Sequence, residues 1–261
     1  MNDRATIAVI GGSGLYSLFD GAEPVSVATP YGSVEVTLGT LGGRAVAFLP
    51  RHGGGHTVSP HLINYRANIW ALASLGVTAI VSSAAVGGIT YPPGTLVLTD
   101  QYLDRTSGRA DTFYDQGSVR HLPSADPFCP VLHEAAVAAV PEAEPTGTVV
   151  VIQGPRFSTR AESQWFRAAG ADIVNMTLYP EVPLAAELNI GTINLAFVTD
   201  ADAAPAEEAL TADLVFARFA EAQPRIIAAI HQLVAAIPEG YAGRPLMDPA
   251  EVAAVLARTP A

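Results

Sequence analysis

Short apolar runs alternate along the chain with longer segments of helical periodicity. The apolar runs predict buried strands at residues 6–10, 34–38, 44–49, 77–81, 95–98, 147–152, 173–176 and 192–199. Apolar spacings of three and four predict helices over residues 60–75, 130–140, 160–169, 180–189, 211–237 and 248–258. Pro224 is expected to kink or divide the 211–237 helix, because proline has no N–H to donate.

This alternation predicts an α/β fold with a mixed, mostly parallel central sheet that is flanked by helices on both faces. No internal repeat or linker is evident, so residues 1–261 are expected to form a single domain. Segment 100–127 is rich in polar residues, Gly and Pro, which predicts a long functional loop. In such folds, ligands bind at the carboxyl ends of the strands.

Composition excludes several classes of chemistry. The net charge of −11 disfavours a nucleic-acid partner. All basic residues are arginine, so neither a Schiff-base lysine nor a P-loop lysine is available. Cys129 is the only cysteine, which excludes an intramolecular disulfide, indicates a reducing compartment and leaves no Cys-His metal spacing. With no secretory pattern and no membrane-length apolar run, a cytoplasmic protein without a membrane partner is expected.

Two glycine-rich segments follow predicted strands and favour anion binding. Gly11–Gly14 (GGSG) lets the backbone approach an anion, and Ser13 adds a hydroxyl donor. The alternatives are a tight turn without a ligand and a dinucleotide site, although the third glycine of that motif is missing. In segment 51–56 (RHGGGH), the Arg51 fork matches phosphate oxygens and the imidazole of His52 can donate to a third oxygen. The alternative is a surface loop with an incidental basic pair.

Two further strand ends carry side chains that suit a sugar and a planar base. Phe157 can stack on a base and Ser158 can hydrogen-bond it, although a lone phenylalanine more often packs in a core. Met176, which follows Asn175, can pack against the face of a sugar. Thr177 can donate to phosphate or, alternatively, cap the next helix.

Asp200 and Asp202 follow the 192–199 strand. Residues i and i+2 of an extended chain point the same way, so both carboxylates can face one edge of a ligand. Close carboxylates raise one pKa, which leaves one neutral acid and one anion. A 6-aminopurine matches this pair, because the acid can donate to N7 while the carboxylate accepts from the amino group. The alternative is a solvated acidic loop.

Taken in order, these segments resemble the nucleoside phosphorylases that include methylthioadenosine phosphorylase. The matching stretches span about three-quarters of the chain and are 9–16 (VIGGSGLY), 51–60 (RHGGGHTVSP), 64–72 (NYRANIWAL), 100–115 (DQYLDRTSGRADTFYD), 121–129 (HLPSADPFC), 154–163 (GPRFSTRAES), 175–182 (NMTLYPEV) and 199–202 (TDAD). One such motif alone does not indicate this family, whereas the whole set in this order is specific for it.

The resemblance implies a homotrimer with active sites near the subunit interfaces. The implied phosphate site comprises Ser13, Arg51, His52, the backbone at Ala85, and Thr177. The implied ribose and base site comprises Phe157, Ser158, Asn175 and Met176, with Asp200 and Asp202 as the catalytic acids. The implied 5′ pocket comprises His56, Ala212 and Val215, with His121 supplied by a neighbouring subunit.

The chain departs from the family pattern at two of these places. Ala84 stands where the family often has Thr or Ser, so one hydroxyl that contacts phosphate is expected to be missing. Ala212 stands where a larger apolar residue is common, which is expected to widen the 5′ pocket.

The implied reaction is reversible phosphorolysis of 5′-methylthioadenosine, with inorganic phosphate as co-substrate and neither cofactor nor metal. Adenosine is expected to be a slower substrate, because an apolar pocket discriminates only modestly. Three alternatives stay open: a phosphorylase of 6-oxopurine nucleosides, a nucleoside hydrolase, and a nucleotide-binding protein without catalysis. Asp200 disfavours the first, since asparagine there would suit a 6-oxo group, and a hydrolase would leave Arg51 and His52 without an anion.

Overall fold

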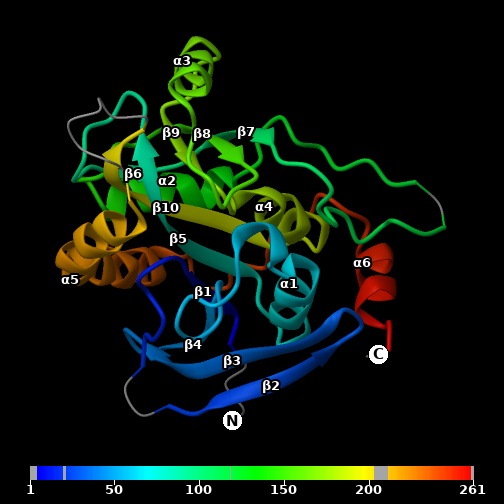
Figure 1. Cartoon of the computed structure of the whole chain (residues 1–261). Coiled ribbons are helices and arrows are strands. Elements are labelled where there is room, and N and C mark those ends of the chain that lie inside the picture. Colours follow the sequence, from blue (N-terminus) through cyan, green and yellow to red (C-terminus); the bar gives the residue numbers. More distant parts are fainter. Residues whose placement is uncertain (1–4, 20–21, 118, 203–210, 260–261) are drawn as a thin grey trace.

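The structure, a computed structural model, describes residues 5–19, 22–117, 119–202 and 211–259. Within these ranges, ten strands form one mixed sheet (Figure 1). The strands are β1 (Ile7–Gly11), β2 (Pro24–Thr29), β3 (Gly32–Leu41), β4 (Arg44–Pro50), β5 (Ala79–Gly88), β6 (Leu96–Leu98), β7 (Gln101–Arg105), β8 (Thr148–Ile152), β9 (Ile173–Asn175) and β10 (Gly191–Ala201). The helices are η1 (Pro60–Leu62), α1 (Tyr65–Ser74), α2 (Pro130–Ala139), α3 (Arg160–Ala168), α4 (Leu178–Glu187), α5 (Ala212–Ala236) and α6 (Pro249–Leu256).

Strand β5 joins the two halves of the sheet. It pairs in parallel with β1 and with β10, and its last residues Gly87 and Gly88 pair antiparallel with β9. The β1–β4, β7–β8 and β8–β9 pairs are also parallel, whereas the β2–β3–β4 meander and the β6–β10 pair are antiparallel. The carboxyl ends of β1, β4, β5 and β10 therefore lie at one edge of the sheet. Strands β8 and β9 run antiparallel to the end of β5, so their carboxyl ends reach the same region from the opposite direction.

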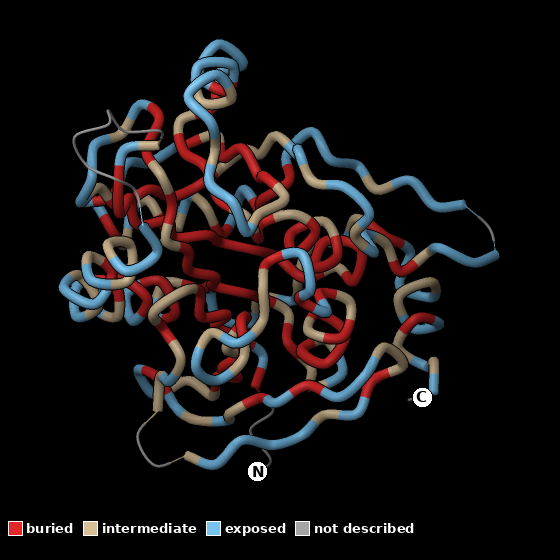
Figure 2. Tube along the Cα trace, viewed as in Figure 1, coloured by how far each residue is buried: buried red, intermediate tan, exposed pale blue. Residues whose placement is uncertain are grey.

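Helices cover both faces of this sheet, as the sequence predicts, and Figure 2 shows the buried strands between them. Alternate residues of β1 belong to opposite cores: Ile7 and Val9 pack with α2 and α5, while Ala8 and Ile10 pack with α1 and α4. This alternation is the period-two pattern of a strand that is buried on both sides. None of the helices in the described ranges is both long and apolar enough to cross a membrane.

Several predicted boundaries were wrong. The predicted 60–75 helix is interrupted, because Ile63 is extended and the Asn64 side chain accepts from the N–H of Ala67 to start α1. The predicted 77–81 strand continues to Gly88 as β5. Helix α5 is assigned without a break, so Pro224 does not divide it; this proline lies on the exposed side, where water can bond the carbonyl it leaves free.

Two strands were not predicted. β2 is an edge strand whose residues are mostly exposed, so it lacks a continuous apolar signal. β7 lies inside the predicted 100–127 loop and pairs with β8 despite its polar sequence QYLDR. The rest of that segment is held on the body of the protein by the Glu187 carboxylate, which accepts from the Thr112 hydroxyl and the Phe113 N–H.

Candidate active site

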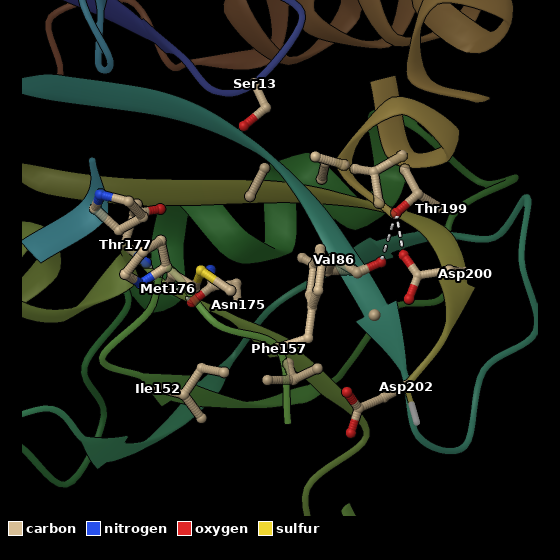
Figure 3. A pocket seen from close by; sticks show the side chains of 18 of the residues that line it. Ser13, Val86, Ile152, Phe157, Asn175, Met176, Thr177, Thr199, Asp200 and Asp202 are labelled. Atoms are coloured by element: carbon tan, nitrogen blue, oxygen red, sulfur yellow. Dashed lines mark hydrogen bonds between the residues drawn. The ribbon is translucent and has the colours of Figure 1, made fainter. Parts of the chain in front are cut away.

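One pocket of about 280 Å³ lies where the six strand ends meet. Its lining includes Ser13 after β1, Arg51 and His52 after β4, Ala84–Gly87 in β5, Phe157 and Ser158 after β8, Asn175–Thr177 at the end of β9, and Thr199, Asp200 and Asp202 at the end of β10. In Figure 3, Ser13 and Thr177 lie on one side of this space, while Asp200 and Asp202 lie across it. The topology thus brings together residues that are far apart in the sequence.

Arg51 is a buried residue of the pocket lining and forms an ion pair with Glu181. Its Nε and Nη2 donate to the two carboxylate oxygens of Glu181 at 2.6 and 2.7 Å, and its Nη1 donates to the carbonyl of Ser83 at 2.8 Å. Burial opposes the charged form of Arg51, but the adjacent Glu181 carboxylate leaves its pKa above the usual value. Glu181 thus holds one edge of the guanidinium, and only the remaining Nη hydrogens can meet an anion.

The imidazole of His52 is fixed by a backbone group. Its Nδ1 lies 2.8 Å from the carbonyl oxygen of Val58, and its ring stacks at 4.3 Å between centroids on His56. Burial lowers the pKa of His52 to about 4, although the Val58 carbonyl opposes this change, and Arg51 and His56 lower the pKa further. The imidazole of His52 is therefore neutral near neutral pH.

Two hydroxyls complete this end of the pocket. Thr177 precedes α4, yet its side chain makes no capping hydrogen bond. Within the described ranges, neither its hydroxyl nor that of Ser13 bonds another protein group, so both are available to a ligand. Ala84 and Ala85 line the same region and contribute only methyl groups and backbone.

The middle of the pocket offers an apolar ring and several unpartnered polar atoms. Phe157 is 37% exposed, so it is not the core residue that a lone phenylalanine often is. The buried Oγ of Ser158 and Nδ2 of Asn175 make no hydrogen bond to protein groups. The Met176 side chain packs beside Gly154, whose positive φ of 65° and lack of a Cβ make room for the Met176 sulfur.

The carboxylate of Asp200 is buried beside Thr199. The Thr199 hydroxyl lies 2.6 Å from Oδ1 of Asp200 and 3.2 Å from the carbonyl of Val86. A β-bulge between Val198 and Asp200 shifts the register with β5, so the regular alternation assumed from the sequence is interrupted there. Asp200 and Asp202 both lie beside Gly87, because a Cβ added to Gly87 would be 3.3 Å from Oδ2 of Asp200 and 3.3 Å from Cβ of Asp202.

The buried Oδ2 of Asp202 makes no hydrogen bond within the described ranges. Burial raises the pKa of Asp202, and the charge of Glu162 raises it further. Burial, rather than a neighbouring pocket acid, is thus the main cause of this raised pKa.

The open side of the pocket is lined by His56, Ala212 and Val215, together with Pro60 and Phe216. Phe216 contacts the His56 ring edge-on at 5.0 Å between centroids. His121, which the sequence assigns to the 5′ pocket of a neighbouring subunit, is exposed and does not line the pocket of its own chain.

Two structural roles were not predicted from the sequence. Glu181 lies near the start of the predicted 180–189 helix and was given no role, although an acidic residue in the apolar α4 is a signal that a cation lies opposite. Arg109 donates to the carbonyls of Gln153 and Met176, both at 2.9 Å, and to that of Tyr179. It thereby ties the segment after β7 to the loops that form the pocket.

The donor set suits an anion and a polar ring system better than a resident metal. Within the described ranges, no cluster of three or more His, Cys, Asp or Glu side chains could hold a metal ion. Cys129 is buried against the Tyr241 hydroxyl, at 3.1 Å, and lies outside the lining of the pocket, as expected for a cysteine that is not a nucleophile.

Comparisons with known proteins agree with this geometry. The family model of the phosphorylase superfamily matches residues 6–237. The S-methyl-5′-thioadenosine phosphorylase of Mycobacterium tuberculosis is 52% identical over 226 residues, which cover 84% of this chain and 85% of that protein. The purine nucleoside phosphorylase of Streptomyces coelicolor is 47% identical over 252 residues, 90% of each chain. The solved structure of methylthioadenosine phosphorylase from Schistosoma mansoni with adenine has a TM-score of 0.84 and 36% identity, covering 88% of this chain and 91% of that chain.

Proposed function

Because this chain belongs to the phosphorylase superfamily, we propose that it cleaves the N-glycosidic bond of 5′-methylthioadenosine with phosphate. The products are adenine and 5-methylthioribose 1-phosphate. The observation that carries this proposal is the pocket itself, which has Ser13 and Thr177 on one side, Asp200 and Asp202 across from them, and Arg51 and His52 in its lining. Adenosine is a slower substrate in this proposal, since loss of an apolar contact changes rates only modestly.

The side of the pocket lined by Arg51, Ser13 and Thr177, the anion end, binds phosphate, which is the nucleophile. Arg51 contributes its remaining Nη hydrogens, Ser13 and Thr177 contribute hydroxyls, and the backbone near Ala85 closes the site. Phosphate then lies below C1′, where its charge stabilises an oxocarbenium-like transition state. Phosphate is a co-substrate, and the proposal needs no further cofactor.

The opposite side of the pocket, which contains Asp200 and Asp202, binds the purine base. Phe157 packs on the purine and Ser158 bonds its edge, while Asn175 and Met176 contact the ribose. Asp200 donates a proton to N7, so that adenine leaves as a neutral molecule. Asp202 accepts from the 6-amino group; its unpartnered Oδ2 supports this role, because an amino donor would offset the cost of burying the ionised carboxylate.

The 5′ substituent faces His56, Ala212 and Val215. We propose that the active protein is a homotrimer in which His121 of the partner subunit completes this pocket. The exposure of His121 in its own chain supports the assignment. We also propose that residues 1–261 act as one domain and that the enzyme works in the cytoplasm, where the lone Cys129 stays reduced.

A 6-oxopurine phosphorylase is the second candidate, because the Streptomyces coelicolor relative is named a purine nucleoside phosphorylase. Against it, an ionised Asp202 would repel a 6-oxo group. A hydrolase would leave the anion end without a purpose, and the missing third glycine after β1 counts against a dinucleotide-binding protein.

One assay separates these functions. Purified protein is incubated with methylthioadenosine, adenosine, inosine or methylthioinosine, each with and without phosphate, and base release is measured. Phosphate-dependent adenine release supports the proposal, and faster hypoxanthine release selects the 6-oxopurine candidate. Release without phosphate indicates a hydrolase, and no release from any substrate indicates a binding role.

A further inference from the structure

The guanidinium of Arg109 links the chain segments that follow β7, β8 and β9. Its Nη2 donates to the carbonyls of Gln153 and Met176, both at 2.9 Å, and its Nη1 donates to the carbonyl of Tyr179. Gln153 follows β8, while Met176 follows β9 and Tyr179 lies in the first turn of α4. Arg109 itself does not line the pocket, so any effect on a ligand passes through the residues whose carbonyls it holds.

A buried tyrosine holds Arg109 in place. The Cζ of Arg109 lies 5.5 Å from the ring centroid of Tyr65, and its Nη1 lies 3.4 Å from the Tyr65 hydroxyl. That hydroxyl donates in turn to the carbonyl of Pro60 at 2.9 Å, which fixes its direction. None of the ion pairs in the described ranges includes Arg109. The planar fork of donors is therefore directed at backbone carbonyls and one hydroxyl, and not at a carboxylate.

The carbonyl of Met176 belongs to the peptide unit that joins Met176 to Thr177. A peptide unit is planar and rigid, so a partner that fixes its oxygen also restrains its N–H. The N–H of this unit, which belongs to Thr177, lies 3.4 Å from Oδ1 of Asn175. Arg109 and Asn175 thus hold the same unit from opposite sides. Figure 3 shows Asn175, Met176 and Thr177 together beside the pocket.

The side chain of Met176 is held by the other segment that Arg109 bonds. Gly154 follows Gln153, and a Cβ added to Gly154 would lie 2.6 Å from the Met176 sulfur. The sulfur therefore fills the space that this glycine leaves. Arg109 bonds the carbonyl just before Gly154 and also the carbonyl of Met176. It thereby keeps the two sides of this close contact together.

We propose that Arg109 is a positioning residue, which orients Met176 toward the ribose and Thr177 toward phosphate. This inference rests on the proposed phosphorolysis, in which these two side chains contact the sugar and the nucleophile. Without Arg109, the peptide unit between them loses the partner of its oxygen, so both contacts weaken together. The acids Asp200 and Asp202 come from the end of β10 and lie across the pocket, where Arg109 makes no hydrogen bond.

Arg109→Met tests the proposal, because methionine is a long side chain without a donor. KM for phosphate and KM for methylthioadenosine should both rise, and kcat/KM should fall by about tenfold to a hundredfold. The affinity for adenine alone, measured by calorimetry, should change little, because Arg156 donates to the carbonyl of Phe157 and holds that loop independently of Arg109. Wild-type kinetics in Arg109→Met overturn the inference. A loss of adenine affinity as large as the change in KM indicates a general loss of structure and overturns it too.

Two further variants make the test specific. Arg109→Lys keeps the charge, but one ammonium group cannot span the acceptors of both segments, so its KM values should lie between those of wild type and Arg109→Met. Wild-type KM values in Arg109→Lys would show that the fork is not needed and would overturn the inference. Arg44→Met is the matched control: Arg44 also donates to two backbone carbonyls, those of Val234 and Ile237, and lies outside the pocket lining. It should keep the wild-type KM values.

Hydrogen exchange gives a second measurement that does not depend on turnover. The N–H groups of residues 174–179 should exchange faster in Arg109→Met than in wild type, while those of β10 should exchange at the wild-type rate. Equal exchange of residues 174–179 in the two proteins overturns the inference, whatever their activity. Absence of phosphate-dependent cleavage by the wild type rejects the proposed phosphorolysis instead, and the exchange rates still decide whether Arg109 holds the peptide between Met176 and Thr177.

Discussion

Thr199 Oγ1 lies 2.6 Å from Oδ1 of Asp200 and also 3.2 Å from the carbonyl oxygen of Val86. The hydroxyl has one proton, so it cannot donate to both oxygens strongly at once. When Asp200 is protonated, its O–H can donate to Thr199 while Thr199 donates to Val86. When Asp200 is ionised, Thr199 can turn its proton to the carboxylate, which stabilises the state after proton transfer.

Thr199→Val should therefore slow the chemical step. Loss of a hydrogen bond to a charged group costs about 1.5–3 kcal/mol, which predicts a kcat lower by about tenfold to a hundredfold. The pH profile of kcat should shift as well, because the proton affinity of Asp200 changes. Thr199→Ser retains the hydroxyl and should stay close to wild type. An unchanged kcat profile in Thr199→Val would remove Thr199 from the proton path.

Asp200→Asn tests the proposed acid itself. The amide cannot transfer a proton to N7 of adenine, so turnover of methylthioadenosine should fall by about a hundredfold to ten-thousandfold. Inosine cleavage should fall less, since asparagine suits a 6-oxopurine. The measurement is kcat/KM of wild type and of Asp200→Asn on methylthioadenosine and on inosine. Equal relative losses of kcat/KM on the two substrates would argue against proton donation that is specific to adenine.

How far the sequence predicts this site depends on the kind of feature. Thr177 follows β9, which runs antiparallel to β5, so its place in the pocket does not follow from strand direction alone. Ser13, Arg51 and Asp200, in contrast, each follow a strand whose apolar run is visible in the sequence, and these parallel strands end at the same edge of the sheet. Their convergence on one pocket could therefore be predicted. The edge strand β2 and the polar β7 have no comparable pattern, so they were missed.

The electrostatics of the site could not be predicted in the same way. The Arg51–Glu181 pair joins positions 130 residues apart, and only the folded geometry shows that Glu181 occupies one edge of the guanidinium. The tautomer of His52 depends on a carbonyl six residues later, through the turn at 51–56. The β-bulge before Asp200 likewise arises from pairing with β5 and not from a local motif.

Glu181→Gln should destabilise the protein strongly. Removal of one partner from a buried ion pair leaves the charge on Arg51 uncompensated, and such changes cost about 3–5 kcal/mol. Denaturant unfolding measures the free-energy change. Asp115→Asn is the matched control: the pair of Asp115 with Arg66 is on the surface, and that change should cost less than about 1 kcal/mol. Similar losses in both variants would contradict the assigned burial.

Stability without phosphate should depend on pH through His52. Burial lowers the pKa of His52 in the folded protein to about 4, from its usual value of 6.5, so the unfolded chain binds the proton first as pH falls. The contribution of His52 to the free energy of unfolding is fully present above pH 6.5 and is lost as pH falls toward 4. Its size is on the order of 3 kcal/mol. Urea unfolding at several pH values measures it. His52→Gln should lose most of this slope, and a slope equal to wild type would assign it to other groups.

Ala84→Ser should strengthen phosphate binding, because Ala84 lines the anion end of the pocket and supplies no hydroxyl there. A neutral hydrogen bond contributes about 0.5–1.5 kcal/mol, so KM for phosphate should fall by about twofold to tenfold while kcat stays close to wild type. Ser13→Ala, the opposite change, should raise KM for phosphate by a similar factor. Phosphate KM values for the two variants, measured at saturating nucleoside, check the pair. If Ala84→Ser leaves KM unchanged while Ser13→Ala raises it, the side chain at position 84 does not reach the bound anion, and the missing hydroxyl has no functional cost.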